Sequence, residues 1–252
     1  MAEVRTGLVP GRGGRVMIEY MYRPTPPPAG AWHLRTAVAL GVLAVLVMAL
    51  VIAEWHPLHA LDADVATGLH SSALAHPGMT RTARVFTDWV WDPWTFRLLL
   101  AVVAVGLWWR RERLLALWLA GTALVGSALQ QALKAAIGRE RPRWREPVDS
   151  AHYAAMPSGH ALTAALVCVL LLWLLRTRST PPAGLWWSAV ALAGVSVAGV
   201  AFTRLWLGVH WLTDTVVGVA LGAAIGLAAT AGWTSLRPDA RQAAHPEPQD
   251  RG

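Results

Sequence analysis

The chain has 252 residues, of which 55% are hydrophobic and 15% are charged, and its mean hydropathy is +0.40. A soluble domain contains about 25% charged residues, so this composition favours an integral membrane protein and excludes a disordered or collagen-like chain. The net charge of +7 is compatible with nucleic acid, anionic lipid or an anionic substrate as a partner.

Two polar segments flank the apolar part of the chain. Residues 1–30 are basic and rich in Gly and Pro, which predicts a disordered tail, and residues 236–252 are predicted to form a second one. The first segment does not resemble a signal peptide, because the apolar stretch that follows starts too late and is too long. Residues 31–235 are therefore predicted to form a single membrane domain.

Six apolar segments are predicted to cross the bilayer, since a helix needs about 20 apolar residues to span the hydrocarbon core. They cover residues 34–54, 95–109, 114–132, 160–175, 185–202 and 212–233. The second is short and is expected to borrow residues from 89–91. The single cysteine, Cys168, lies in the fourth and cannot form an intrachain disulfide. The predicted fold class is an all-α, polytopic membrane protein with six transmembrane helices.

Arginines in the short connections predict the orientation of the chain, because basic residues gather on the cytoplasmic side. Four arginine clusters fall on one side: before the first span, after the second, after the fourth and after the sixth. Both termini are therefore expected in the cytoplasm, and residues 56–93, 139–157 and 204–211 on the outer side. The outer segment 139–157 breaks the rule with Arg139, Arg141, Arg143 and Arg145, which indicates a function for these charges.

The first of three polar segments at outer helix ends contains Lys134, the only lysine of the chain, and Arg141. On a continuous helix these two residues would lie two turns apart on one face. Pro142 is expected to end the helix or redirect the chain nearby. The alternative is that Lys134 simply extends its ammonium group to the lipid headgroups.

The second segment, Pro157-Ser158-Gly159-His160, directly precedes a long apolar run. Ser158 is expected to be the N-cap of that helix, whose free amides and dipole favour an anion. Gly159 permits a close approach of the backbone to a ligand. The alternative is a capped helix with an interfacial histidine.

The third segment runs from Thr203 to Asp214 and includes Arg204 and His210. His210 and Asp214 are spaced i, i+4, so a helix starting here would place them on one face. A carboxylate on one imidazole nitrogen fixes the tautomer and leaves the other nitrogen free to act as nucleophile or base. The alternative is a local His–Asp pair that closes the helix end.

Together the three segments supply three cations, a hydroxyl, backbone amides, two histidines and a carboxylate. The cations suit a phosphate dianion, and the two histidines suit an attacking neutral imidazole and a proton-donating imidazolium. One carboxylate without other oxygen ligands disfavours a Mg²⁺ site, so neither a metal nor another cofactor is expected. The outer histidines at 56, 59, 70 and 76 also lack tight metal-ligand spacing.

The order Lys-x6-Arg-Pro, Pro-Ser-Gly-His and Thr-Arg-x5-His-x3-Asp resembles the type 2 phosphatidic acid phosphatase (PAP2) superfamily and its bacterial six-helix lipid phosphatases. The motifs cover residues 134–214, and the likeness in helix pattern covers 34–233. Thr203 departs from the commoner serine and retains its hydroxyl. The resemblance implies that His210 attacks phosphorus to form a phosphohistidine, that Asp214 orients it, and that His160 protonates the leaving oxygen and then activates water. It implies that the phosphate oxygens are held by Lys134, Arg141, Ser158, Gly159 and Arg204.

The predicted function is metal-independent hydrolysis of a lipid phosphate or diphosphate at the outer membrane interface. Undecaprenyl diphosphate, phosphatidic acid, diacylglycerol diphosphate and phosphatidylglycerophosphate are substrates compatible with the resemblance. The expected partners are the lipid substrate and membrane lipids. Nucleic acid is disfavoured because the arginines are scattered over both sides of the membrane. The alternative is a lipid or small-molecule transporter or flippase that does not hydrolyse its substrate.

Overall fold

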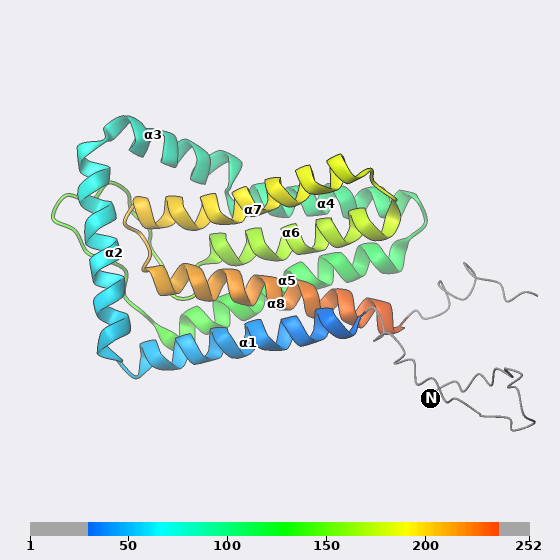
Figure 1. Cartoon of the computed structure of the whole chain (residues 1–252), viewed down its shortest axis with the longest axis horizontal. Coiled ribbons are helices and arrows are strands. Elements are labelled where there is room, and N and C mark those ends of the chain that lie inside the picture. Colours follow the sequence, from blue (N-terminus) through cyan, green and yellow to red (C-terminus); the bar gives the residue numbers. More distant parts are fainter. Residues whose placement is uncertain (1–29, 237–252) are drawn as a thin grey trace, which may run out of the picture.

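The computed structural model describes residues 30–236; both predicted tails lie outside this range, apart from Gly30 and Leu236. Within it the chain is helical and contains no strand (Figure 1). The elements are α1 (Ala31–Ile52), α2 (His56–Ala75), α3 (Pro77–Val85), the π-helical turn η1 (Phe86–Val90), α4 (Pro93–Trp109), α5 (Arg113–Ile137), α6 (Gly159–Arg178), α7 (Ala183–Trp206) and α8 (Leu212–Leu236). The prediction of an all-α fold is confirmed.

Six helical stretches are long and apolar enough to cross a membrane, as predicted. They are α1, the continuous run Pro77–Trp109, α5, α6, α7 and α8. Their outward faces keep large apolar side chains exposed, such as Val42 on α1 and Leu124 on α5. Such exposure suits helices that are surrounded by lipid.

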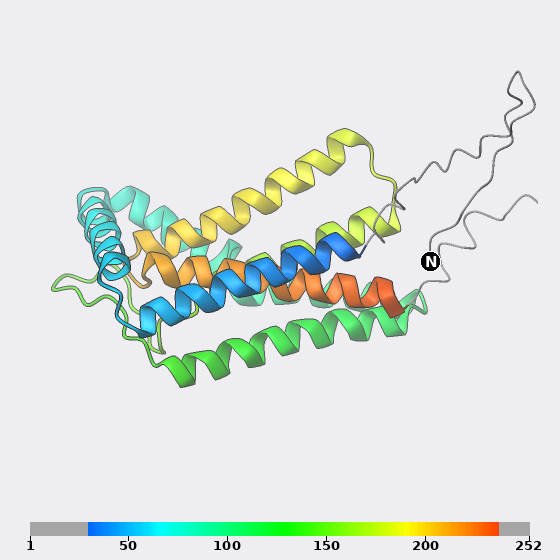
Figure 2. The ribbon, with the colours of Figure 1, turned by 60° about the horizontal axis from the view of Figure 1, so that its bottom comes forward.

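The core of the bundle is the pair α6 and α8, with α1 packed on the other side of α8 and with α5 and α7 on opposite flanks (Figure 2). Glycines allow α6 and α8 to approach closely. A Cβ added at Gly218 would lie 2.6 Å from the carbonyl oxygen of Ser158, and one at Gly222 would lie 2.2 Å from that of Leu162. Larger residues would force the helices apart. This close approach fixes the start of α6 against the start of α8, where the second and third motifs lie.

The segment 56–93 contains more structure than the sequence analysis anticipated. Its first part is α2, a 20-residue helix that lies across the end of the bundle (Figure 1). Its buried residues are Asp62, Ala66, His70 and Ala73, a helical spacing that marks the face turned to the bundle. The second part is α3 and η1, which continue through Asp92 into α4.

The expectation that Lys134 and Arg141 share one helical face was wrong. Helix α5 ends at Ile137, and Gly138 adopts a left-handed conformation with φ +61° while its N–H bonds to the carbonyl of Lys134. Glycine at this position is a common helix terminator because it lacks a Cβ. The chain therefore leaves the helix before Pro142, and Arg141 reaches the site from the loop 138–158.

Candidate active site

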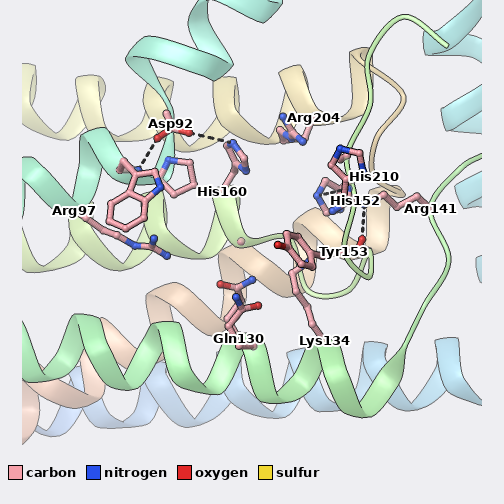
Figure 3. A pocket seen from close by; sticks show the side chains of 15 residues that line it. Asp92, Arg97, Gln130, Lys134, Arg141, His152, Tyr153, His160, Arg204 and His210 are labelled. Atoms are coloured by element: carbon pink, nitrogen blue, oxygen red, sulfur yellow. Dashed lines mark hydrogen bonds and ion pairs between the residues drawn. The ribbon is translucent and has the colours of Figure 1, made fainter.

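A cavity of about 320 Å³ opens at the end of the bundle that α2 covers, between α4, α5, α6, the end of α7 and the loop 138–158. Six of the eight predicted site residues line it (Figure 3): Lys134, Arg141, Gly159, His160, Arg204 and His210. The other two, Ser158 and Asp214, are fully buried next to it, and the Ser158 amide donates to the Asp214 carbonyl at 3.0 Å. The fold thus brings the three motifs to one place.

His210 lies in the connection between α7 and α8 and is 2% exposed. Its Nδ1 is 3.3 Å from Asp214 Oδ2, which also accepts the Trp211 amide at 2.9 Å. Its Nε2 is 3.1 Å from Nη1 of Arg141. Since a guanidinium can only donate, Nε2 must be the acceptor, and the ring proton then sits on Nδ1 facing Asp214. In this tautomer the lone pair of Nε2 lies at the pocket wall and accepts the Arg141 N–H, a hydrogen bond that must be exchanged before Nε2 can attack another atom.

The electrostatic surroundings of His210 keep it neutral. Burial lowers its pKa well below the ordinary value of 6.5, and the Arg141, Arg204 and Lys134 cations lower it further. A neutral imidazole is the form that a nucleophile requires. The same burial lowers the pKa of the Arg141 guanidinium, while the charge of Asp214 opposes that shift.

Three cations lie around the His210 imidazole: Lys134, Arg141 and Arg204. None of the three has a carboxylate within 4.0 Å among the described residues. Lys134 donates to the carbonyl of Ala154, and Arg141 donates through Nε to that of Tyr153 at 2.7 Å. Arg204 is 6% exposed, and its buried Nε has no hydrogen-bond partner in the described part of the chain. Arg204 donates through Nη1 to the hydroxyl of Thr87 at 3.4 Å. All three cations are thus held by neutral oxygens, which leaves their charge available to an anionic ligand.

The start of α6 contributes the second histidine and the backbone. His160 is partly buried, and its Nε2 lies 3.9 Å from Oδ2 of Asp92, the N-cap residue of α4. Ser158 is the N-cap, as predicted, but its side chain makes no capping bond, and its buried hydroxyl has no partner among the described residues. At Gly159 an added Cβ would lie 2.8 Å from the amide of the Gln130 side chain, so a larger residue here would displace that amide.

A buried ionic network behind His210 was missed by the sequence analysis. Arg139 donates to Asp214 Oδ1 at 2.6 Å and to Asp62 Oδ2 on α2 at 2.7 Å. Asp62 also accepts the amide of Thr213 at 2.9 Å and its hydroxyl at 2.6 Å. Asp214 is therefore held from two sides, by His210 and by an arginine that α2 anchors. In the sequence, the helical spacing of Asp62 with Ala66 was the available indication that Asp62 lies on the buried face of a helix.

A second contact from α2 supports the segment between α7 and α8 that contains His210. His70 stacks on Trp144 with ring centroids 4.0 Å apart, and the Trp144 indole donates to the Gly208 carbonyl at 2.9 Å. Gly208 has φ +65°, a conformation that favours glycine. By contrast, Arg143 pairs with Glu140 at the surface. No group of three or more His, Cys, Asp or Glu side chains with metal-binding proximity occurs in residues 30–236.

Comparison with known proteins agrees with this arrangement. Residues 115–237 match the family model of the PAP2 superfamily. The chain is 30% identical over 170 residues to decaprenylphosphoryl-5-phosphoribose phosphatase of Mycobacterium tuberculosis (strain ATCC 25618 / H37Rv), a match that covers 66% of this chain and 86% of that protein. The chain belongs to the PAP2 superfamily. This confirms the resemblance inferred from the three motifs.

Further relatives support the assignment of this PAP2 protein as a phosphatase. Phosphatidylglycerophosphatase B of Bacillus subtilis (strain 168) is 31% identical over 127 residues, or 49% of this chain and 61% of that protein. The crystal structure of a transmembrane PAP2-type phosphatidylglycerolphosphate phosphatase from Bacillus subtilis shares the fold, with a TM-score of 0.72 at 20% identity over 81% of this chain and 98% of that one. The prediction of a multi-pass membrane phosphatase is confirmed.

Proposed function

We propose that this PAP2 phosphatase hydrolyses a lipid phosphate through a covalent phosphohistidine at His210, without a metal ion. The observation that carries the proposal is the position of His210 Nε2 in a pocket where Lys134, Arg141 and Arg204 have no carboxylate partner within salt-bridge distance. Three cations match the charge of a phosphate monoester and of the transition state for its transfer. The relatives, which are phosphatases of lipid-linked phosphates by name, support a lipid substrate.

In the first step, Nε2 of His210 attacks phosphorus and the bond between phosphorus and the leaving oxygen breaks. His160 donates a proton to that oxygen, so the lipid product leaves as a neutral hydroxyl if the substrate is a monoester. The imidazole of His210 becomes positively charged, and Asp214 stabilises it through Nδ1. Arg139 and Asp62 keep the Asp214 carboxylate in place during this change.

In the second step, the deprotonated His160 removes a proton from water, whose oxygen attacks the phosphorus of the phosphohistidine. The bond between phosphorus and Nε2 breaks, inorganic phosphate leaves, and both histidines return to their starting states. The phosphate oxygens are held throughout by Lys134, Arg141 and Arg204, with the Ser158 hydroxyl and the Gly159 backbone at the start of α6.

We further propose that the pocket faces the extracytoplasmic side and that both termini lie in the cytoplasm. The connections at the opposite end of the bundle carry Arg110, Arg111 and Arg113 after α4, and Arg176 and Arg178 at the end of α6, where Arg178 pairs with Glu112. An excess of arginines in short connections is typical of the cytoplasmic side of a membrane protein. Undecaprenyl diphosphate, phosphatidic acid and phosphatidylglycerophosphate are the candidate substrates. No observation favours the transporter alternative.

The enzymatic test uses purified protein in detergent micelles with EDTA and a panel of these lipids. We expect release of inorganic phosphate that vanadate inhibits, because trigonal-bipyramidal vanadate resembles the phosphoryl transition state. His210→Ala should abolish release while the matched variant His56→Ala, at an exposed position of α2, should retain it. Full activity of folded His210→Ala would contradict the mechanism.

The orientation test uses cysteines introduced into a Cys168→Ala background. Ser150→Cys lies in the exposed loop on the pocket side, and Arg111→Cys lies in the exposed turn at the opposite end. A membrane-impermeant maleimide added to intact cells should label the first and spare the second. The reverse labelling would place the pocket in the cytoplasm.

A further inference from the structure

The pocket extends well beyond the cations that surround His210. Its other wall is formed by Asp92, Trp94 and Arg97 of the start of α4 and by Gln130 and Gln131 of α5. Figure 3 shows Arg97 at the end of the pocket opposite Arg141, with Gln130 between Arg97 and Lys134. These residues lie outside the three motifs, and their side chains have no role in the steps proposed above. We call this region the α4 arm of the pocket.

Arg97 is the one cation of the α4 arm, and it lies one turn after the start of α4, within the membrane-spanning segment Pro77–Trp109. Its guanidinium stacks over the Trp94 ring at 5.0 Å, and no carboxylate lies within 4.0 Å of it in the described part of the chain. Its Nε is buried and has no hydrogen-bond partner among the described residues. An ionised side chain within a spanning helix is energetically expensive and is usually retained for a ligand.

An arginine near the end of a span can also extend to the headgroups as a simple anchor. The surroundings of Arg97 disfavour this role. Besides lining the pocket, its side chain borders a small crevice between α5 and α6 that Leu162 and Leu166 line. It therefore marks the boundary between the polar pocket and the apolar interior. A cation at such a boundary can hold the anionic group of a lipid whose hydrocarbon chain stays in the bilayer.

Neutral amides occupy the stretch between the two cationic ends of the pocket. Gln130 is 6% exposed and packs beneath Gly159, and Gln131 lines the same wall. Carboxamides both donate and accept, which suits hydroxyl groups and does not suit a further phosphate. In order along the pocket there are thus three cations, a hydrogen-bonding section beside His160, and Arg97. The carboxylate of Asp92 also lines this wall, where it accepts the Trp94 amide at 2.7 Å and lies 3.9 Å from Nε2 of His160.

On the basis of the proposed function, we propose that Arg97 binds a second phosphate of the substrate, a phosphodiester. The substrate class would be a lipid joined through that phosphodiester to a short hydroxylated linker, which carries the phosphate monoester that is hydrolysed. A monoester dianion would meet three cations and a diester monoanion would meet Arg97, while the charge of Asp92 on the same wall faces His160. A diphosphate would place both phosphates at the three-cation end, and phosphatidic acid would leave Arg97 without an anion.

The test compares two substrates with identical acyl chains in the same micelles: phosphatidylglycerophosphate, which contains the diester, and phosphatidic acid, which does not. Arg97→Gln should lower kcat/KM for the first by about 10- to 100-fold, mainly through KM, because it removes charge-assisted hydrogen bonds. The same variant should change kcat/KM for phosphatidic acid by less than about 3-fold. Arg97→Lys should recover part of the loss, and Arg110→Gln, at the other end of α4, should affect neither substrate.

A measurement on the unmodified enzyme makes the proposal independent of how variants fold. With phosphatidic acid as substrate, phosphatidylglycerol should inhibit competitively, and diacylglycerol at the same mole fraction should inhibit much less. Equal inhibition by both lipids, or an equal effect of Arg97→Gln on both substrates, would overturn the assignment. So would a larger effect on prenyl diphosphate than on phosphatidylglycerophosphate. In each case, phosphate release that depends on His210 would leave the proposed function intact.

Discussion

The two ends of the pocket differ in how firmly their charged groups are held. At the His210 end, Arg141 donates to the carbonyls of Tyr153 and Val209, and Asp214 is fixed by Arg139 and the Trp211 amide. In the α4 arm, Arg97 has a stacking contact and a buried Nε without a partner. Arg204 at the first end also has a buried Nε without a partner among the described residues, so the contrast concerns the other groups. Arg141 and Asp214 are prearranged, as a transition state requires, whereas Arg97 is available to a ligand.

The source of this rigidity is α2, the outer helix that precedes the residues matching the family model. Asp62 ties α2 to both Arg139 and Thr213, and His70 ties it through Trp144 to the connection that carries His210. In the α4 arm, Asp92 accepts the Trp94 amide and lies near His160, but no ion pair holds Arg97 among the described residues. We therefore expect substitutions at the His210 end to reduce kcat for every substrate, and substitutions in the α4 arm to act selectively.

The largest loss of kcat/KM should come from removing one of the cations that we propose to bind phosphate at the His210 end of the pocket. Arg204→Gln should lower kcat/KM by about 10²- to 10³-fold for all lipid phosphates, because its buried guanidinium stabilises charge in the transition state. Initial rates of phosphate release across the substrate panel measure this. A loss confined to one substrate would assign Arg204 to substrate selection.

The next effect should come from breaking the anchor between α2 and Asp214. Asp62→Ala leaves Arg139 without one carboxylate in a buried site, which should destabilise the fold by about 3–5 kcal/mol. The melting temperature in detergent should fall, and kcat should fall about 10-fold with little change in KM.

Comparison of a double variant with a single one separates stability from catalysis at this anchor. Asp62→Asn with Arg139→Gln also leaves buried Asp214 without its cation, so its melting temperature should stay below that of Asp62→Asn alone, which keeps the Arg139–Asp214 pair. The kcat of Asp62→Asn alone should stay low, because one of the charges that hold Arg139 is lost. Recovery of kcat together with stability in Asp62→Asn would mean that the network serves folding alone.

The pH dependence of kcat/KM tests the neutral state of His210. The nucleophile is lost only as pH falls through its pKa, which burial and the neighbouring cations hold well below 6.5. Arg141→Gln removes one of these cations, so the pKa of His210 should rise and its acid limb should move to higher pH. The ionisation of the substrate is the same for both proteins and cancels in the comparison. If the acid limb of the kcat/KM profile does not move in Arg141→Gln, protonation of His210 is not the cause of that limb.

The smallest effect should come from a charge outside both ends. Arg143 and Glu140 are 80% and 74% exposed, so their pair at 2.9 Å contributes little. Arg143→Gln should change kcat/KM by less than about 2-fold for any substrate. A loss of kcat/KM for phosphatidylglycerophosphate alone would mean that Arg143 also contacts the second phosphate of that substrate.

The sequence was sufficient to predict the six spans and six residues that line the pocket around His210, because apolar length and motif spacing can be read from the sequence. It did not predict the end of α5, since Gly138 stops the helix before Pro142 can. The sequence also did not distinguish Arg139 from Arg143, although both lie in one arginine-rich stretch. Arg139 pairs with buried carboxylates, whereas Arg143 is exposed to solvent. Those differences depend on where α2 packs, a contact across some 77 residues of sequence.

The most direct measurement of the central claim is to trap the covalent intermediate. Brief mixing of the enzyme with lipid phosphate labelled at the terminal phosphorus, followed by alkaline quenching and peptide mass spectrometry, should find the phosphoryl group on His210. The label should be absent from His210→Ala. In His160→Ala the label should form more slowly, because the leaving oxygen is not protonated, and should then persist, because water activation would also be slow. Phosphate release by the unmodified enzyme with no phosphoryl group on His210 would contradict the account.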